Sequence, residues 1–386
     1  MKRHATVLFL VLAGVITMAQ PSAQLDVPTP QNTVVRLDAA LGALVPAGAK
    51  AELLKGDYFG AIEGPVWVDD PSTGSGSPRA SSRGEGQGGY LLFSDMAANV
   101  IYKWTPAGQL SVFLDKSGFT GSDVNSVGGQ YTNGRLHLLL IGSNGLTLDR
   151  EGRLIIAGMT DRNVTRLEKN GSRTTLAERY EGKRLNSPND LVVKSDGAIY
   201  FTETTSGIRG RDEGPARELL FHGVYLIKDG VLRLLDKDPQ GSAPNGIAFS
   251  PDEKILYVNG GVKITRYDVL ADDTIANPRV LIDMSVEKTP GNTDGMKVDR
   301  NGNIYCSAPG GIWIISPQGK HLGTIVTPDR VANVAFGDAD SKSLYMVGGR
   351  SLWRIRVNVA GIRPLPAAGS GQQAAGSGQQ AAGSGQ

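Results

Sequence analysis

Residues 245–260 read Asn-Gly-Ile-Ala-Phe-Ser-Pro-Asp-Glu-Lys-Ile-Leu-Tyr-Val-Asn-Gly. This stretch is one copy of a repeated unit from which the fold can be predicted. An opening polar residue and a glycine precede a short apolar strand, an Asp-containing turn and a second apolar strand, which is the pattern of a β-hairpin. The pattern occurs six times along the chain. Its copies open at Glu63, Asn144, Asn189, Asn245, Asp294 and Asn333. Recurrence of one such unit indicates a repeat architecture.

A further strand pair follows most copies, so each repeat supplies four strands. These pairs begin near Asn99, Val164, Gly223 and Gly311. The copies open 39–56 residues apart, except for a first interval of 81 residues that contains a Gly/Ser-rich insertion. The spacing predicts an all-β fold, a six-bladed β-propeller with four-stranded antiparallel blades. An open solenoid is the alternative, but six copies favour a ring because closure removes exposed strand edges.

The domain layout follows from this repeat. We expect the propeller over residues 24–363, with residues 71–89 as a Gly/Ser-rich insertion loop and residues 364–386 as a disordered Gly/Ser/Gln-rich tail. Residues 34–54 can supply a strand that closes the ring, although the sequence does not tell which blade it joins. The glycine-containing insertion at 117–140 is expected to form a loop over one channel mouth.

The N-terminus has the features of a signal peptide. Lys2, Arg3 and His4 precede an apolar run of 14 residues, Ala5 to Met18, and small residues follow it. The run is shorter than the ~20 residues that a membrane-spanning helix needs. The sequence therefore predicts cleavage near residue 23, export to the periplasm or the medium, and no membrane span afterwards.

Charge and cysteine content narrow the function further. Forty basic and 38 acidic residues give a formal net charge of +2, without the basic stripe that follows a phosphate backbone, so a nucleic-acid partner is not expected. Cys306 is the only cysteine, which excludes an intramolecular disulfide and suggests a buried strand residue.

No G-x-S-x-G motif is present and the four histidines are scattered, so serine-hydrolase chemistry is not supported. His222 and His321 are expected to be ordinary strand or surface residues.

The six opening residues are the candidate site. The first strand of a propeller blade lines the central channel, so its first residues form a ring around the axis. All six are carboxylates or carboxamides, and such oxygen donors suit a hard cation such as Ca²⁺. Asn and Asp before glycine are also ordinary turn residues. Glu63 favours a cation site over turn chemistry, because glutamate has no comparable preference for turns.

Four motifs carry a family resemblance. Glu63-Gly-Pro-Val-Trp67, Leu185-Asn-Ser-Pro-Asn-Asp190, Pro244-Asn-Gly246 and Thr293-Asp-Gly-Met-Lys-Val-Asp299 occur in this order. Together they resemble the gluconolactonase and senescence-marker-protein (regucalcin-like) family over roughly residues 45–362. The resemblance implies a six-bladed propeller that holds a divalent metal, usually Ca²⁺, and hydrolyses a small-molecule lactone.

Carried over to this chain, the resemblance assigns roles to individual residues. Glu63, Asn245 and Asp294 match the family's metal ligands, and Asn189 matches an amide that faces both substrate and metal. Asp294 would also be the catalytic acid/base, and Asn144 would line the substrate pocket. Residues 158–162, residues 201–205 and Ser187 depart from the family's patterns, so the pocket walls, and with them the preferred lactone, are expected to differ.

Other functions remain compatible with the same residues. An exported, non-catalytic propeller could bind a sugar or protein ligand and use the metal structurally, because a fold does not determine a function. A strictosidine-synthase-like propeller fits Glu63 and Asp294 less well. The oligomeric state is not indicated by the sequence.

Overall fold

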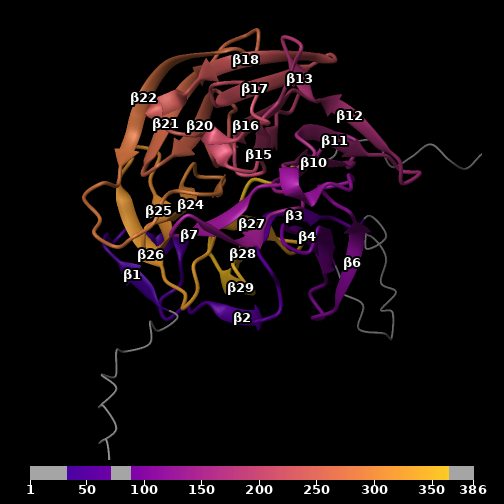
Figure 1. The fold of residues 1–386 in the computed structure, drawn as a ribbon. Helices are drawn as coiled ribbons and strands as arrows, with labels where there is room; N and C mark the ends of the chain where they lie inside the picture. The colour runs from indigo at the N-terminus through magenta and orange to yellow at the C-terminus, as the bar shows by residue number, and fades with distance from the viewer. Residues whose placement is uncertain (1–32, 71–87, 365–386) are drawn as a thin grey trace, which may run out of the picture.

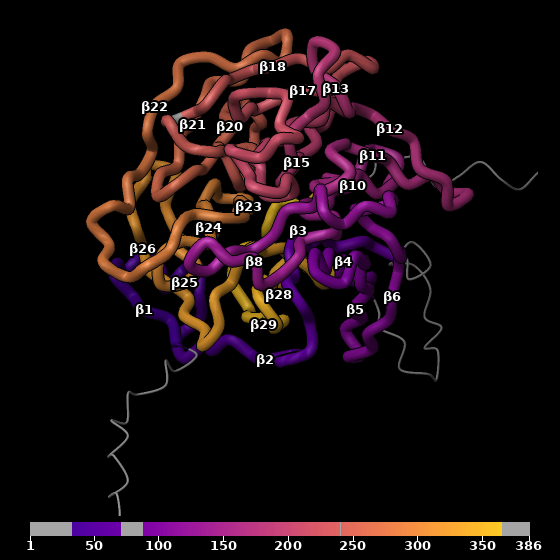
Figure 2. The backbone as a smooth tube through the Cα atoms, in the orientation of Figure 1, coloured from indigo at the N-terminus to yellow at the C-terminus, as the bar shows by residue number. Residues whose placement is uncertain are grey.

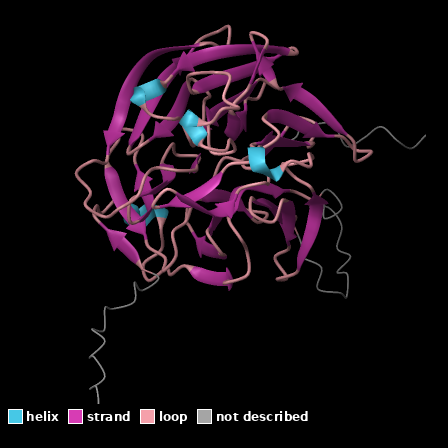
Figure 3. Cartoon of the chain, viewed as in Figure 1, coloured by secondary structure: helices cyan, strands magenta, loops and turns pink. Residues whose placement is uncertain are grey.

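The computed structural model describes residues 33–70 and 88–364, and nearly all of its regular structure is β-strand (Figures 1 and 3). The predicted signal peptide, most of the 71–89 insertion and all but the first residue of the predicted tail lie outside the described residues. The export prediction therefore stays a prediction. No helix within 33–70 or 88–364 is long and apolar enough to cross a membrane.

Six antiparallel sheets are arranged as a ring of blades, which confirms the predicted six-bladed β-propeller (Figure 1). The first blade contains β3 (Ile62–Val68), β4 (Tyr90–Asp95), β5 (Val100–Trp104) and β6 (Leu110–Asp115). The second contains β9 (Leu146–Leu148), β10 (Leu154–Gly158), β11 (Asn163–Leu167) and β12 (Arg173–Ala177). The third contains β15 (Ser187–Val193), β16 (Ile199–Thr204), β17 (Gly223–Lys228) and β18 (Val231–Lys237).

The other three blades follow the same order. The fourth contains β19 (Ile247–Phe249), β20 (Ile255–Gly260), β21 (Lys263–Val269) and β22 (Ile275–Asp283). The fifth contains β23 (Met296–Val298), β24 (Ile304–Ala308), β25 (Gly311–Ile315) and β26 (His321–Ile325). The sixth has β27 (Asn333–Gly337), β28 (Ser343–Gly348) and β29 (Ser351–Arg356) from the end of the chain, and its outer strand comes from the N-terminal region.

The N-terminal region closes the ring with two strands. β2 (Glu52–Lys55) pairs with β29 and completes the sixth blade, with Leu53 opposite Trp353. β1 (Val34–Arg36) pairs with β26 and adds a fifth strand to the fifth blade. Between them, the helix α1 (Leu41–Leu44) buries two leucines in the core between these blades. Figure 2 shows the indigo N-terminal chain beside the yellow C-terminal strands.

The hydrophobic core is divided among the interfaces between blades. Successive strand residues point to opposite faces of a sheet, and in a propeller both faces are covered. On β16, for example, Tyr200 packs toward Phe249 of the fourth blade, whereas Phe201 belongs to the cluster shared with the second blade. Trp67 of the first blade stacks on Tyr345 of the sixth, so the interface that closes the ring also has an apolar core.

Smaller elements complete the described chain. Two additional hairpins are formed by β7 (Gly129–Thr132) with β8 (Arg135–Leu139), and by β13 (Arg179–Tyr180) with β14 (Lys183–Arg184). Short 3-10 helices cover Val124–Ser126, Arg211–Glu213 and Pro239–Gly241. Cys306 lies on β24 with no exposed surface, as predicted, and burial raises the pKa of its thiol to about 12.

Glycines let the first strands of neighbouring blades approach closely at the channel. A Cβ atom on Gly246 would lie 2.4 Å from the carbonyl oxygen of Asp294 in the next blade. A Cβ atom on Gly145 would lie 2.6 Å from the carbonyl oxygen of Asn189. Both distances are shorter than van der Waals contact, so these two positions of the ring require glycine.

The close approach makes Gly246→Ala a test of the ring geometry. We expect this substitution to reduce the free energy of unfolding by about 1–3 kcal/mol, because the new methyl group pushes two blades apart. Chemical denaturation of the purified protein measures the effect. Gly42→Ala is the matched control, since a Cβ on Gly42 in α1 meets no atom within 4 Å. Equal unfolding midpoints for Gly246→Ala and the wild type would contradict the expectation.

Candidate functional site

A polar cavity of about 860 Å³ occupies one mouth of the central channel. It lies where the first strands of the blades begin, and the repeat therefore brings equivalent residues together there. Five of the six predicted ring residues line it, namely Glu63, Asn144, Asn189, Asn245 and Asp294. The sixth, Asn333, is buried beneath the cavity and supports Glu63.

Two carboxylates of this cavity, Glu63 and Asp294, have pKa values shifted from their usual range. Glu63 is 4% exposed, and its Oε2 accepts hydrogen bonds from the backbone N–H of Gly64 at 2.6 Å and from Asn333 Nδ2 at 2.9 Å. Burial, followed by the negative charge of Asp294, raises the pKa of Glu63 well above its usual range. Burial also raises the pKa of Asp294, although an ion pair from Arg330 to its Oδ2 at 2.9 Å opposes the shift.

The donor set of the cavity fits a hard divalent cation. The negative charge of Asp294 raises the pKa of the buried Glu63, and a cation beside these two carboxylates would relieve that repulsion. The Asn245 side chain hydrogen-bonds Asp294, and Asn189 and Asn144 add further amide oxygens to the same cavity. Residues 33–70 and 88–364 contain no group of three or more His, Cys, Asp or Glu side chains that is placed to hold a metal ion. Glu63, Asp294 and the three amides are therefore the residues that could hold a metal.

Asp190 is a channel residue that the sequence reasoning did not select. It stands where four other copies have glycine, it is 1% exposed, and its Oδ1 accepts the backbone N–H of Leu191 at 2.9 Å. Its Oδ2 lies 3.5 Å from Asn333 Nδ2 and 3.6 Å from Lys297 Nζ. The replacement of that glycine by a carboxylate was the available signal. Together these three residues close the floor of the cavity.

Two long connections form one side of the rim. The predicted 117–140 loop contains the β7–β8 hairpin, which Figure 2 draws across the central part of the ring. The backbone N–H of Gly128 donates to the carbonyl of Gly207 at 2.9 Å, so the hairpin is joined to the connection between β16 and β17. Gln130 and Leu140 from one connection, and Arg211 from the other, line the cavity.

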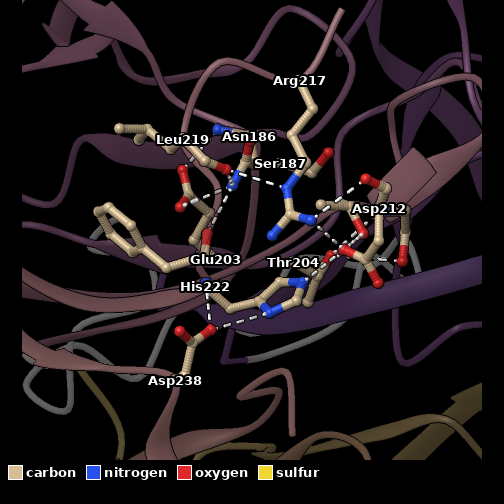
Figure 4. Close-up of polar contacts among 12 residues, drawn as sticks. Asn186, Ser187, Glu203, Thr204, Asp212, Arg217, Leu219, His222 and Asp238 are labelled. Carbon is tan, nitrogen blue, oxygen red and sulfur yellow. Dashed lines mark hydrogen bonds and ion pairs between the residues drawn. The ribbon is translucent and has the colours of Figure 1, made fainter. Parts of the chain in front are cut away.

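His222 corrects the expectation that it is an ordinary strand or surface residue, because it lies in the cavity wall. Its Nε2 is 2.9 Å from Oδ1 of Asp212 and its Nδ1 is 3.3 Å from Oδ1 of Asp238 (Figure 4). Arg217 Nη1 lies 3.2 Å from the same Asp212 oxygen. His222 belongs to a sequence insertion between β16 and β17, so the repeat gave no indication that it lines the cavity. His321, in contrast, stacks on Trp313 in the fifth blade and does not line the cavity.

Glu203 anchors the strand that carries Asn189. Its Oε1 accepts the backbone N–H of Asn186 at 2.5 Å (Figure 4). Its Oε2 accepts Tyr225 Oη–H at 3.1 Å. The residue has no exposed surface. Desolvation by burial raises the pKa of Glu203 to about 7, against the stabilising effect of these hydrogen bonds.

The fold and the site together define an antiparallel β-propeller with an oxygen-lined polar cavity at one channel mouth. The chain belongs to the SMP-30/Gluconolactonase/LRE-like family, whose profile matches residues 62–350. It is 32% identical to a gluconolactonase from Zymomonas mobilis over 84% of this chain and 85% of the relative. A pentonolactonase, XacC from Haloferax volcanii, is 28% identical over 52% of this chain and 65% of its own length.

Solved structures agree with this assignment. A structure described as a gluconolactonase from Xanthomonas campestris matches with a TM-score of 0.66 and 29% identity, covering 89% of this chain and 99% of that protein. The predicted family is thereby confirmed. The prediction of a carboxylic ester hydrolase is confirmed at the level of these relatives, which are named as enzymes that act on lactones.

The pKa of Glu203 predicts a pH-dependent stability. Because the pKa of Glu203 is about 7 in the folded protein and that of an ordinary glutamate is 4.5, the folded protein retains a proton that the unfolded chain loses between these values. Stability is therefore fully retained below the lower value and falls as the pH rises toward 7, by up to about 3 kcal/mol. In Glu203→Gln this loss should disappear. Denaturation of wild type and variant between these pH values measures the difference.

The exposed residue Glu213 provides the matched control. Glu213→Gln is expected to keep the pH profile of the wild type. If the stability difference between Glu203→Gln and the wild type is constant over this pH range, Glu203 does not take up a proton on folding.

Proposed function

We propose that this protein is a metal-dependent lactonase that hydrolyses a sugar lactone or a related cyclic ester. The observation that carries the proposal is a pair of carboxylates, the buried Glu63 and the half-buried Asp294, at a cavity lined by three asparagine amides. The gluconolactonase and pentonolactonase relatives support the reaction class. The cavity volume of about 860 Å³ lies in the range of small-molecule sites.

The proposed metal is a divalent cation, most simply Ca²⁺, held by Glu63, Asn245, Asp294 and Asn189. When bound, such a cation supplies polarisation of the lactone carbonyl and stabilises negative charge on its oxygen. The all-oxygen donor set supports calcium over softer metals.

Asp294 carries the proton transfers of the proposed reaction. Its carboxylate takes a proton from a water molecule as the water oxygen bonds to the carbonyl carbon of the lactone. The ring C–O bond then breaks, and Asp294 returns the proton to the ring oxygen, which yields an open-chain hydroxy acid. Arg330, at 2.9 Å, orients Asp294 and favours its ionised form. The amides of Asn189 and Asn144, which line the cavity, would hydrogen-bond hydroxyl groups of the substrate.

The cavity also has an apolar wall, which bears on the choice of lactone. Ala61, Met96, Leu140 and Met159 pack together and line the cavity. Met159 lies within the segment that departs from the family pattern, and its sulfur is 3.8 Å from Asn144 Nδ2. This wall supports cyclic esters with an apolar part as substrates beside polyhydroxylated aldonolactones.

Asp294→Asn is expected to reduce lactone turnover by at least ~100-fold, because the amide cannot accept and return the proton. The assay uses aldonolactones and simple cyclic esters, with calcium and after chelation. Chelation of the wild type should remove the same activity. Asp57→Asn is the matched control, since Asp57 lines the same cavity but its side chain is 97% exposed. A protein that binds metal but hydrolyses none of these esters would instead be a non-catalytic binding module.

A second measurement addresses the metal independently of turnover. Glu63→Gln removes one negative charge from the proposed donor set and should weaken calcium binding by more than about tenfold. Isothermal titration calorimetry of chelator-treated protein measures the affinity. Asp57→Asn again serves as the control and should bind calcium like the wild type. An unchanged affinity in Glu63→Gln would remove Glu63 from the metal site.

A further inference from the structure

The opposite mouth of the central channel contains a second cavity, of about 500 Å³. It is lined by the first strands of all six blades, at the ends remote from Glu63 and Asp294. Most of its wall is apolar, formed by Trp67, Leu148, Val193, Ile247 and Phe249. Its volume lies within the range of about 300–1,000 Å³ that is typical of small-molecule sites.

This second cavity is a separate compartment from the proposed lactonase site. No residue lines both cavities. Lys297 lines the second cavity, and its Nζ lies 3.6 Å from the buried carboxylate of Asp190. Asn333 contacts Asp190 at 3.5 Å and Glu63 at 2.9 Å, so a layer of polar side chains divides the channel. A ligand of the second cavity would therefore not be the lactone substrate.

Basic side chains exceed acidic ones around the second cavity. Its lining contains Arg150, Lys194, Lys297 and Arg363, against Asp149 and Glu253. Most of these charges are paired: Lys194 with Asp273 at 2.8 Å, Arg363 with Asp69 at 2.9 Å, and Asp149 with Arg153 at 2.7 Å. Glu253 accepts hydrogen bonds from Ser195.

Arg150 differs from the other basic residues of this lining. Its exposed side chain makes no hydrogen bond or ion pair with any residue in the described part of the chain. It lies in the turn between β9 and β10, directly after Leu148 and Asp149. An uncompensated guanidinium therefore stands at the rim of an apolar cavity.

We propose that this mouth binds an amphipathic organic anion, namely a carboxylate on an aliphatic chain. The guanidinium of Arg150 can donate two parallel hydrogen bonds to a carboxylate. The aliphatic chain would enter the cavity between Leu148, Val193 and Phe249, where removal of its surface from water is favourable. A cationic amphiphile meets the same apolar wall, but the two carboxylates of the lining, Asp149 and Glu253, already accept hydrogen bonds from Arg153 and Ser195. The proposal does not depend on the lactonase function.

The test is calorimetric titration of the full-length protein with octanoate. One octanoate is expected to bind per chain, while butanoate and octyltrimethylammonium bind at least tenfold more weakly. Trp67 is the one tryptophan in the described wall of the cavity, so its fluorescence should change with the same concentration dependence. The experiment contradicts the proposal if the protein binds no octanoate, or binds the cationic amphiphile equally well.

Two arginine variants identify the charge that is responsible. Arg150→Gln should weaken octanoate binding about fivefold or more, the effect of losing a charge-assisted hydrogen bond. Arg300→Gln is the matched control, because Arg300 follows Asp299 in the equivalent turn of the fifth blade but does not line the cavity. Equal affinities for Arg150→Gln and the wild type would overturn the proposal. Val193→Phe, which narrows the cavity, should also weaken binding, and circular dichroism checks that each variant is folded.

Discussion

The structure depends on how closely six first strands approach one another around the channel. At four of the six strand beginnings a glycine follows the opening residue, and at Gly145 and Gly246 a side chain would overlap the carbonyl of the next blade. The backbone N–H of Gly145 also donates to the carbonyl of Asn189 at 2.7 Å, which joins two blades directly. The same proximity that closes the ring forces the opening side chains into one small volume.

That convergence has an electrostatic cost. Glu63 and Asp294 are withdrawn from water and placed near each other, and both have raised pKa values. An isolated arrangement of this kind would be unfavourable, because burial of charge is expensive unless it is compensated. The six apolar interfaces between blades provide the stability that offsets it. The channel is polar at one mouth and largely apolar at the other, with Asp190, Lys297 and Asn333 between them.

Much of the fold and part of the site could be predicted from the sequence, because both follow from the repeat. Equivalent positions in successive copies occupy equivalent places in the ring, which is why five opening residues, Glu63 and Asp294 among them, meet in one cavity. His222 could not be placed this way, since it belongs to an insertion without a counterpart in other blades. A closing strand from residues 34–54 was predicted, but its pairing with β29 was not, because the two strands are remote in sequence and no turn connects them. Asp190 had a signal in the sequence, a carboxylate where four other copies have glycine, but only its contacts with Asn333 and Lys297 show its place in the channel.

The completion of the sixth blade has a consequence for biosynthesis. Arg354 forms an ion pair with Glu52 at 2.7 Å, although the two residues are 302 positions apart. A growing polypeptide must therefore keep β2 unpaired while five blades are translated, and loop closure over such a distance is slow. At about 5–20 residues per second, this interval lasts at least 15 seconds. The nascent chain thus leaves the ribosome as an open arc, and its ends join only after nearly all of it has been synthesised.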